Sequence, residues 1–585
     1  MRNADFVEGL AGRDEALARI EPFGTALRTE HHFVVTTLAG CAGLGQGASP
    51  VALGADPGAA CAALSAPVPA SALGLPTRGA TIDSATWVEA TPLKVAERAP
   101  TPAARVSPAT PAHCRVLGRI APVNAKSPPI LFQVNLPLQW NGRSVQYGGG
   151  GFNGTLTNAL GLLPGQRLDT PSPLAQGFVT VGTDSGHQSG PQDIPQAFAL
   201  DEEALVNFAH ASYKKVRDVS VALTQRAFGR KPDKMYFMGS SEGGREGLVM
   251  AQRYPDAFDG IFSRVPVVSW TGLQHAGLRD GLALQSGGWL NAAQMQRVHE
   301  AVLQACDAAD GVQDGLVANP VGCRQRFDVA ALRCQATPND SCLTDAQIKA
   351  VKTLHSPLRF DFDLAHQVRE YPGRGPSGEA LPSFGPTGGW KAWWLGSAPP
   401  SMPPSPANGI GWVFGAGAIQ YFYARDPKFD LTRYSPQDHA ARIREVSELM
   451  DATQPDLSAF RARGGKLVML EYMADYAQSP YAGIRYFESV QAKMGHDVTP
   501  AFARLYTAPG VDHVGSGAPA FVDMLPVLTA WVEQGKAPGP LQVVEQEVQA
   551  PFPVKRALPL CQWPQWPRYK TGEVSQAASF ECVRD

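Results

Sequence analysis

The 585-residue sequence contains no apolar run that approaches the ~18–20 residues needed to cross a membrane. It also has no block of one charge, because 51 lysines and arginines are interspersed with 53 aspartates and glutamates. Hydrophobic residues make up 44% of the chain, which is typical of a globular protein. These features argue against a membrane-spanning protein and against one that binds nucleic acid or another polyanion.

No CxxC pair and no cysteine–histidine spacing typical of a metal site occurs among the nine cysteines. If Cys41 belongs to a leader, eight cysteines remain, and an even number in local pairs predicts disulfides formed in an oxidising compartment. The alternative is a set of buried free thiols in a cytosolic enzyme. Spacing alone favours Cys306–Cys323, Cys334–Cys342 and Cys561–Cys582, which leaves Cys61–Cys114.

The N-terminal segment has features of an export signal in an unusual position. Leu38–Cys41 resembles a lipoprotein cleavage box and follows a short apolar stretch, but the polar segment 1–30 lies in front of it. We interpret residues 1–60 as a leader or flexible segment, with Cys41 as a candidate lipid anchor; a disordered tail is the alternative. The expected location is outside the cell or in the periplasm, with an outer-membrane lipoprotein as one form of it.

Strand-like and helical segments alternate from about residue 61, which is typical of a mostly parallel sheet covered by helices on both faces. Residues 271–440 differ, because they contain four of the cysteines, a tryptophan cluster and few strand signals. We interpret them as an inserted lid domain, which divides the core into residues 61–270 and 441–585, the latter including a C-terminal tail. The clearest predicted strands are residues 130–136, 178–182, 234–238 and 466–470, and the longest predicted helix is 203–228.

One predicted strand, 234–238, runs into the sequence Gly-Ser-Ser-Glu-Gly, which a helical stretch follows. A G-x-S-x-G motif between a strand and a helix is the nucleophile elbow of α/β-hydrolases. We therefore predict an α/β-hydrolase fold with a large inserted lid domain and Ser241 as the nucleophile. The backbone N–H of Glu242 would donate to the oxyanion of the reaction. A glycine-rich turn without a chemical role is the alternative.

A serine hydroxyl needs a base, and in this fold an acid and then a histidine follow the serine along the chain. His513 lies in a glycine-bounded loop after a predicted strand, and Asp475 follows the end of another strand. Glu471 competes for the role of the acid, but it lies inside that strand. The glycine-rich loop Gly148–Gly154 is expected to supply the second oxyanion donor.

These motifs together resemble the tannase and feruloyl esterase family from about residue 61 to residue 582. The resemblance implies hydrolysis of esters of aromatic acids, such as feruloyl or galloyl esters, through an acyl-enzyme. It implies Ser241, Asp475 and His513 as the catalytic triad, the N–H groups of Gly151 and Glu242 as oxyanion donors, and the same four cysteine pairs. Aromatic residues expected to contact the substrate are Trp393, Phe414 and Trp270, with Trp394 and Trp412 near them. The matching stretches are residues 140–143, 148–154, 183–187, 241–247, 393–396, 509–513 and 559–561.

The resemblance also implies a structural calcium ion in the lid, held by an Asp/Gly-rich loop after Cys306. Calcium prefers hard oxygen ligands from such flexible loops. A plain acidic turn is the alternative. The implied ligands are the carboxylates of Asp307, Asp310 and Asp314 and the carbonyls of Val312 and Leu316.

The sequence departs from the family at several positions. Ser240 and Val514 stand where a disulfide-bonded cysteine pair is usual. Glu471, which would repel a substrate anion if ionised, and Gln478 replace a histidine and a phenylalanine of the member that hydrolyses mono(2-hydroxyethyl) terephthalate. Residues 408–422 contain no arginine, although that member binds a free carboxylate with one there. We therefore expect neutral aromatic esters as substrates; a terephthalate half-ester hydrolase and a non-catalytic binding protein are the alternatives.

Overall fold

The computed structural model describes residues 51–99, 101–190, 193–381 and 389–585. The chain divides into two units after Gly47, and all described residues lie in the second unit. The predictions for residues 1–50, including the lipid anchor at Cys41, lie outside the described residues. In the part of the chain that is described, no helix is both long enough and apolar enough to cross a membrane.

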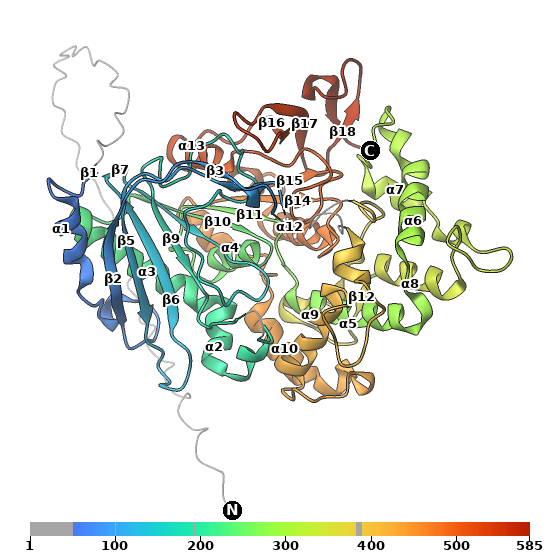
Figure 1. Cartoon of the computed structure of the whole chain (residues 1–585), viewed down its shortest axis with the longest axis horizontal. Helices are drawn as coiled ribbons and strands as arrows, with labels where there is room; N and C mark the ends of the chain where they lie inside the picture. The colour runs from blue at the N-terminus through green and yellow to red at the C-terminus, as the bar shows by residue number, and fades with distance from the viewer. Residues whose placement is uncertain (1–50, 100, 191–192, 382–388) are drawn as a thin grey trace, which may run out of the picture. The chain divides into compact units, whose positions relative to one another are not determined.

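A mixed sheet of eleven strands forms the centre of the described unit (Figure 1). The central strands, from β9 to β15, run parallel, and antiparallel strands flank them on either edge. This arrangement confirms the predicted α/β architecture. The strands in spatial order are β16 (Leu541–Gln546), β17 (Val554–Gln562), β15 (Ala503–Ala508), β14 (Lys466–Tyr472), β11 (Gly260–Arg264), β10 (Lys234–Ser240), β8 (Arg143–Tyr147), β9 (Val179–Thr183), β6 (Ile130–Pro137), β5 (His113–Ile120) and β2 (Ala80–Val88).

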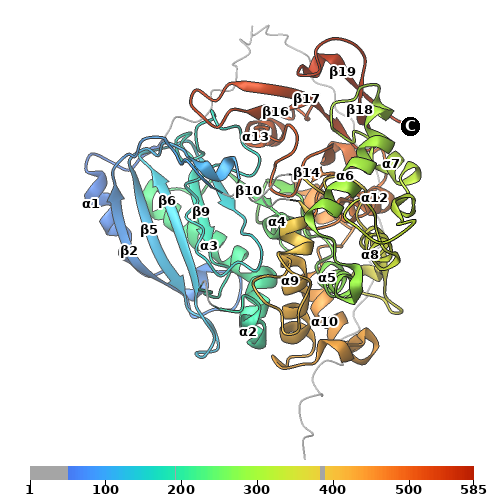
Figure 2. The same ribbon diagram turned by 45° about the vertical axis from the view of Figure 1, so that its right-hand side comes forward.

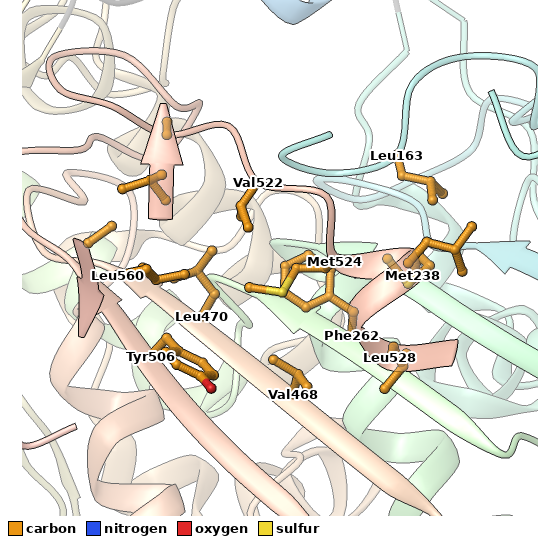
Figure 3. Close-up of a cluster of buried hydrophobic side chains, with 14 of the residues drawn as sticks. Leu163, Met238, Phe262, Val468, Leu470, Tyr506, Val522, Met524, Leu528 and Leu560 are labelled. Atoms are coloured by element: carbon orange, nitrogen blue, oxygen red, sulfur yellow. The ribbon is translucent and has the colours of Figure 1, made fainter. Parts of the chain in front are cut away.

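Helices bury both faces of the central strands, and successive side chains of a strand alternate between the faces. In β10, Met235 and Phe237 pack in the same cluster as α4 and α12, whereas Tyr236 and Met238 pack with α13. Figure 3 shows the α13 side of this core, where Met524 lies among side chains of the strands. Burial on both faces explains why these strands are continuous apolar runs in the sequence. The helices are α3 (Ser212–Phe228), α4 (Glu242–Arg253), α12 (Pro480–Met494) and α13 (Met524–Gln534).

A long insertion separates two neighbouring strands of the sheet. β11 ends at Arg264 and β14 begins at Lys466, although the two strands pair in parallel. Figures 1 and 2 both show the helices of this insertion gathered away from β2, β5 and β6. Its role as a lid, with limits at residues 271 and 440, stays a prediction. The longer helices are α5 (Trp270–Ala283), α6 (Ala292–Cys306), α8 (Asp345–His355), α9 (Ile410–Ala418) and α10 (Ala440–Met450).

The predicted helix 203–228 is interrupted in the structure. A π-helical turn, Asn207–Ala211, separates α2 (Glu202–Val206) from α3. This wider turn leaves the carbonyls of Phe208 and Ala209 to accept hydrogen bonds from Arg245, at 3.1 and 2.8 Å. Hydrophobic spacing could not reveal the interruption, because a distant side chain stabilises it.

All four predicted disulfides are formed. Cys61–Cys114 joins α1 (Pro57–Ala62) to β5. The stretch expected to be flexible therefore includes the start of a helix, whose first turn is capped by Asp56 through the N–H of Ala59 at 2.9 Å. The disulfides confirm the cysteine pairing that spacing favoured.

Candidate active site

Ser241 lies at the turn between β10 and α4 with φ 60° and ψ −121°. This conformation is rare for a residue with a side chain, and it is typical of functional turns. A Cβ atom at Gly239 would lie 2.0 Å from the carbonyl oxygen of Gly243, and one at Gly243 would lie 2.7 Å from that of Gly149. Glycine is therefore required on both sides of the serine, because the backbone segments come too close for any side chain.

The structure brings Ser241, His513 and Asp475 into one hydrogen-bonded chain. His513 Nε2 is 3.0 Å from Ser241 Oγ, and His513 Nδ1 is 2.7 Å from Asp475 Oδ2. The second carboxylate oxygen of Asp475 accepts hydrogen bonds from the backbone N–H groups of Ala477, at 2.7 Å, and Gln478, at 3.0 Å. Asp475 thus orients the imidazole so that its Nε2 faces the serine hydroxyl.

Glu471, the competing acid, does not contact His513. Its side chain is buried beneath α12, so close to Gly483 that a Cβ atom there would lie 1.7 Å from Oε1. Neither carboxylate oxygen has a hydrogen-bond partner among the described residues. Burial, and next the charge of Asp475, raise the pKa of Glu471 well above its usual value. A raised pKa favours the neutral form of Glu471, and Glu471 is not among the described residues that line the cavity, so neither observation supports the expected repulsion of a substrate anion.

The two expected oxyanion donors come from two different segments of the chain. Gly151, with φ 59°, lines the same cavity as Ser241, and Glu242 is the first residue of α4. The N–H groups of a first helical turn have no partner within the helix, so that of Glu242 is free to bind a ligand. The Glu242 side chain turns away into the protein, where it accepts a hydrogen bond from the fully buried Arg245 at 2.7 Å.

A residue that the sequence reasoning missed holds the glycine-rich loop in place. Glu246, on α4, accepts hydrogen bonds from Gly149 N at 2.9 Å and from Asn153 Nδ2 at 2.7 Å. Asn153 Oδ1 in turn accepts from Gly150 N at 2.6 Å. Burial raises the pKa of Glu246 to about 7. The sequence offered one signal for this role: Glu246 is a charged residue in the helix that directly follows the Ser241 turn.

A cavity of about 710 Å³ opens in front of Ser241 and His513. Trp393 and Phe414 form part of its wall, with their ring centroids 5.7 Å apart. The expected contact residue Trp270 is not part of that wall. It is 1% exposed and packs 4.6 Å from Phe422. Trp270 belongs to the core, as do the buried Trp394 and Trp412, because their side chains point to the inner side of the inserted helices.

None of the four disulfides joins the segments that carry the triad, and Ser240 and Val514 replace the usual cystine beside it. We expect mild reductant to leave activity intact until the fold itself loosens, since each disulfide contributes ~2–4 kcal/mol. Hydrolysis rate and near-ultraviolet circular dichroism, followed together during reduction, test this. Loss of activity ahead of any loss of structure would contradict it.

The expected calcium loop ties its carboxylates to its own backbone. Asp307 accepts hydrogen bonds from the N–H groups of Asp314 and Gly315, both at 3.1 Å, and Asp314 also pairs with Arg556. Among the described residues, no group of three or more histidine, cysteine, aspartate or glutamate side chains is placed to hold a metal ion. The oxygen donors suit calcium chemically, but Asp314 would have to leave Arg556 to join them.

Comparisons with known proteins agree with this architecture. An uncharacterized esterase of Agrobacterium fabrum is 35% identical over 90% of this chain and 93% of its own length. The mono(2-hydroxyethyl) terephthalate hydrolase of Piscinibacter sakaiensis is 32% identical over 87% of this chain and 89% of its own. The crystal structure of feruloyl esterase B from Aspergillus oryzae has the same fold, with a TM-score of 0.70 at 23% identity over 87% of this chain and 98% of that one.

The family model for tannase and feruloyl esterase matches residues 114–583. The match spans both parts of the sheet and the insertion between them, so it covers every candidate catalytic, oxyanion, substrate-contact and calcium residue. These relatives are ester hydrolases, which argues against the alternative of a non-catalytic binding protein. The chain therefore belongs to the tannase and feruloyl esterase family of carboxylic ester hydrolases with an α/β-hydrolase fold.

Proposed function

We propose that this protein hydrolyses esters of aromatic acids through an acyl-enzyme formed on Ser241. The observation that carries the proposal is the hydrogen-bonded chain from Asp475 through His513 to Ser241, which ends at a cavity with aromatic side chains in its wall. A hydroxyl in such a chain has a base within reach and becomes an effective nucleophile.

In the first half of the reaction, Ser241 Oγ attacks the ester carbonyl carbon and its proton passes to His513 Nε2. The N–H groups of Gly151 and Glu242 donate to the oxyanion, while Asp475 stabilises the imidazolium. The imidazolium then gives its proton to the alkoxy oxygen, and the alcohol leaves. In the second half, His513 takes a proton from water, whose oxygen attacks the acyl carbon. The bond to Ser241 Oγ then breaks, the imidazolium returns its proton to that oxygen, and the acid leaves.

The aromatic preference rests on Trp393 and Phe414. Trp393 lies 6.1 Å from the ring of His513, and Phe414 lies 4.9 Å from Phe152, which follows Gly151. Flat acyl groups can pack against such rings next to the reacting carbonyl. A panel of methyl ferulate, methyl gallate and p-nitrophenyl butyrate tests the assignment, and the aromatic esters should have the highest kcat/KM. Faster hydrolysis of aliphatic esters would overturn the substrate class and leave ester hydrolysis in place.

An uncharged acyl group should be preferred to one that carries a carboxylate. The residues that the insertion contributes to the cavity, Trp393, Ile410 and Phe414, are all uncharged. We expect the methyl ester of mono(2-hydroxyethyl) terephthalate to be hydrolysed at the hydroxyethyl ester with a kcat/KM ~10-fold or more above that of the free acid, because the insertion offers no cation to a carboxylate on the acyl part, and a buried carboxylate without a partner is poorly bound. Chromatographic measurement of released ethylene glycol decides it, and a preference for the free acid would place a cation against the acyl group.

We further propose that the loop Asp307–Leu316 binds a structural calcium ion through the carboxylates of Asp307, Asp310 and Asp314 and the carbonyls of Val312 and Leu316. The loop adjoins the His513 loop, because a Cβ atom at Gly510 would lie 2.5 Å from Leu316 Cδ2. Calcium there would keep the histidine loop in place without taking part in the chemistry.

Chelator should lower the Tm of the purified protein, and added calcium should restore it. Differential scanning fluorimetry measures both changes, with magnesium as the control for ionic strength. Asp310→Asn should lose this response. Metal analysis that finds no calcium in the protein, together with a Tm that ignores both chelator and calcium, would remove the proposal.

We propose that the protein is secreted or resides in the periplasm, because its four disulfides form and persist only where thiols can be oxidised. Detection of the protein in the periplasmic or culture fraction of its host tests this, and recovery from the cytoplasm with free thiols would contradict it.

A further inference from the structure

Arg264 is a cation beside the nucleophile that the proposed mechanism does not use. It is the last residue of β11 and the register neighbour of Ser240 in β10. Its Nε donates to Ser240 Oγ at 2.9 Å, and its Nη1 donates to the hydroxyl of Tyr472 at 3.2 Å. Among the described residues no carboxylate lies within ion-pair distance of it. A guanidinium has five N–H donors, so the outer ones remain for a ligand.

The end of the guanidinium borders the substrate cavity. Nη1 is 3.6 Å from the position of a Cβ atom at Gly165 and 3.9 Å from that at Gly515, and both glycines line the cavity with Arg264. The absence of side chains at these two positions leaves room in front of the charge. Apart from the catalytic His513, Arg264 is the sole basic residue among the described lining residues, and none of them is acidic. The part of the cavity at Arg264 can therefore accept an anionic group.

Ser240 and Val514 line the same cavity as Arg264. These are the positions where the family usually has a disulfide. Here a hydroxyl and an isopropyl group replace it, and the hydroxyl accepts a hydrogen bond from the guanidinium. The replacement of the usual disulfide by Ser240 and Val514 therefore affects the substrate cavity as well as stability.

The position of His513 indicates which part of an ester enters this space. His513 must protonate the alkoxy oxygen, so that oxygen lies against the imidazole, and the next residues, Val514 and Gly515, line the wall that leads to Arg264. Phe414 lies on the side of the oxyanion donor, within 4.0 Å of a Cβ position at Gly151, and Trp393 lies 6.1 Å from the ring of His513. The acyl group therefore extends toward Phe414, and the alcohol part extends along Val514 and Gly515 toward Arg264.

We propose that Arg264 binds a carboxylate on the alcohol part of the substrate, so that the preferred substrates are aromatic acyl esters of hydroxy acids. The inference rests on the proposed function and adds its alcohol specificity. A guanidinium can bind a carboxylate through two parallel hydrogen bonds, which suits a charge that must be held beside the reacting ester.

The test compares caffeoylquinate, in which the alcohol carries a free carboxylate, with its methyl ester on the carboxylate. The ratio of the two kcat/KM values is measured within each variant, so a general loss of stability or activity cancels. In Arg264→Gln this ratio should fall by ~10-fold or more relative to wild type, and Arg264→Lys, which keeps the charge, should lie between them. Quinate should inhibit hydrolysis of p-nitrophenyl acetate by the wild type more strongly than by Arg264→Gln.

A second pair, monomethyl and dimethyl terephthalate, carries the carboxylate in the acyl part. The ratio of the kcat/KM values of these two esters should be the same in wild type and Arg264→Gln. An unchanged ratio for the caffeoyl pair, or a change confined to the terephthalate pair, would overturn the inference while leaving the proposed function in place. Failure of the wild type to hydrolyse either caffeoyl ester would instead overturn the proposed substrate class and this inference with it.

Discussion

Ser241→Ala should lower kcat for every ester by ~10³-fold or more, with the fold retained. The change removes the one hydroxyl that His513 Nε2 contacts, at 3.0 Å. Alanine and serine have the same backbone restrictions, so the turn at φ 60° is no more strained than before. Initial rates with methyl ferulate and p-nitrophenyl acetate measure the loss, and circular dichroism with a thermal melt verifies the fold.

A matched control is available on the neighbouring strand. Ser263, on β11, is also buried, and its Oγ donates to the carbonyl of Gly244 on α4 at 2.7 Å, but it does not line the cavity. Ser263→Ala removes a serine hydroxyl from the same helix–strand contact and should keep most of the activity. More than a tenth of the wild-type rate in Ser241→Ala would mean that another residue is the nucleophile.

Asp475→Asn should be nearly as damaging, with a loss of ~10³-fold or more in kcat. The Asp475 oxygen that accepts from Ala477 and Gln478 must stay an oxygen, because both partners are N–H donors. The amide nitrogen of asparagine would then face His513 Nδ1, which could only accept. The proton of a neutral imidazole would move to Nε2, where it prevents the ring from taking the proton of Ser241. The same two esters measure the loss.

Glu471→Gln is the comparison that decides between the two acids, and it should keep most of the activity. It should also change how stability depends on pH. Because the folded pKa of Glu471 is raised, the folded protein keeps a proton that the unfolded chain releases above its ordinary pKa of 4.5, so wild-type stability falls as pH rises toward the folded pKa. Glutamine does not titrate, so the Tm of the variant should fall less than that of the wild type as the pH rises above 4.5. Loss of activity in Glu471→Gln with survival in Asp475→Asn would exchange the two roles.

Local patterns were sufficient to predict much of this protein. The elbow around Ser241 is a short motif in which Gly239 is required by the nearby carbonyl of Gly243, and its strand and helix lie next to it in the chain. The order of Asp475 and His513 follows from the order of the parallel strands. The cysteine pairs of short separation could be predicted because few partners lie near each cysteine. These features depend on neighbouring residues or on chain order, which a sequence shows directly.

Other properties depend on which side chains meet across the fold, and only the tertiary structure decided them. Whether Trp270 or Trp393 faces the cavity depends on how the inserted helices are rotated, which composition does not specify. The raised pKa of Glu471 comes from its burial, which the contact with Gly483 of α12 shows. Glu246 acts on Gly149 across 97 residues of sequence, and Arg264 meets Tyr472 across 208. Such contacts have no local signature, because packing brings the partners together after each segment has formed its own structure.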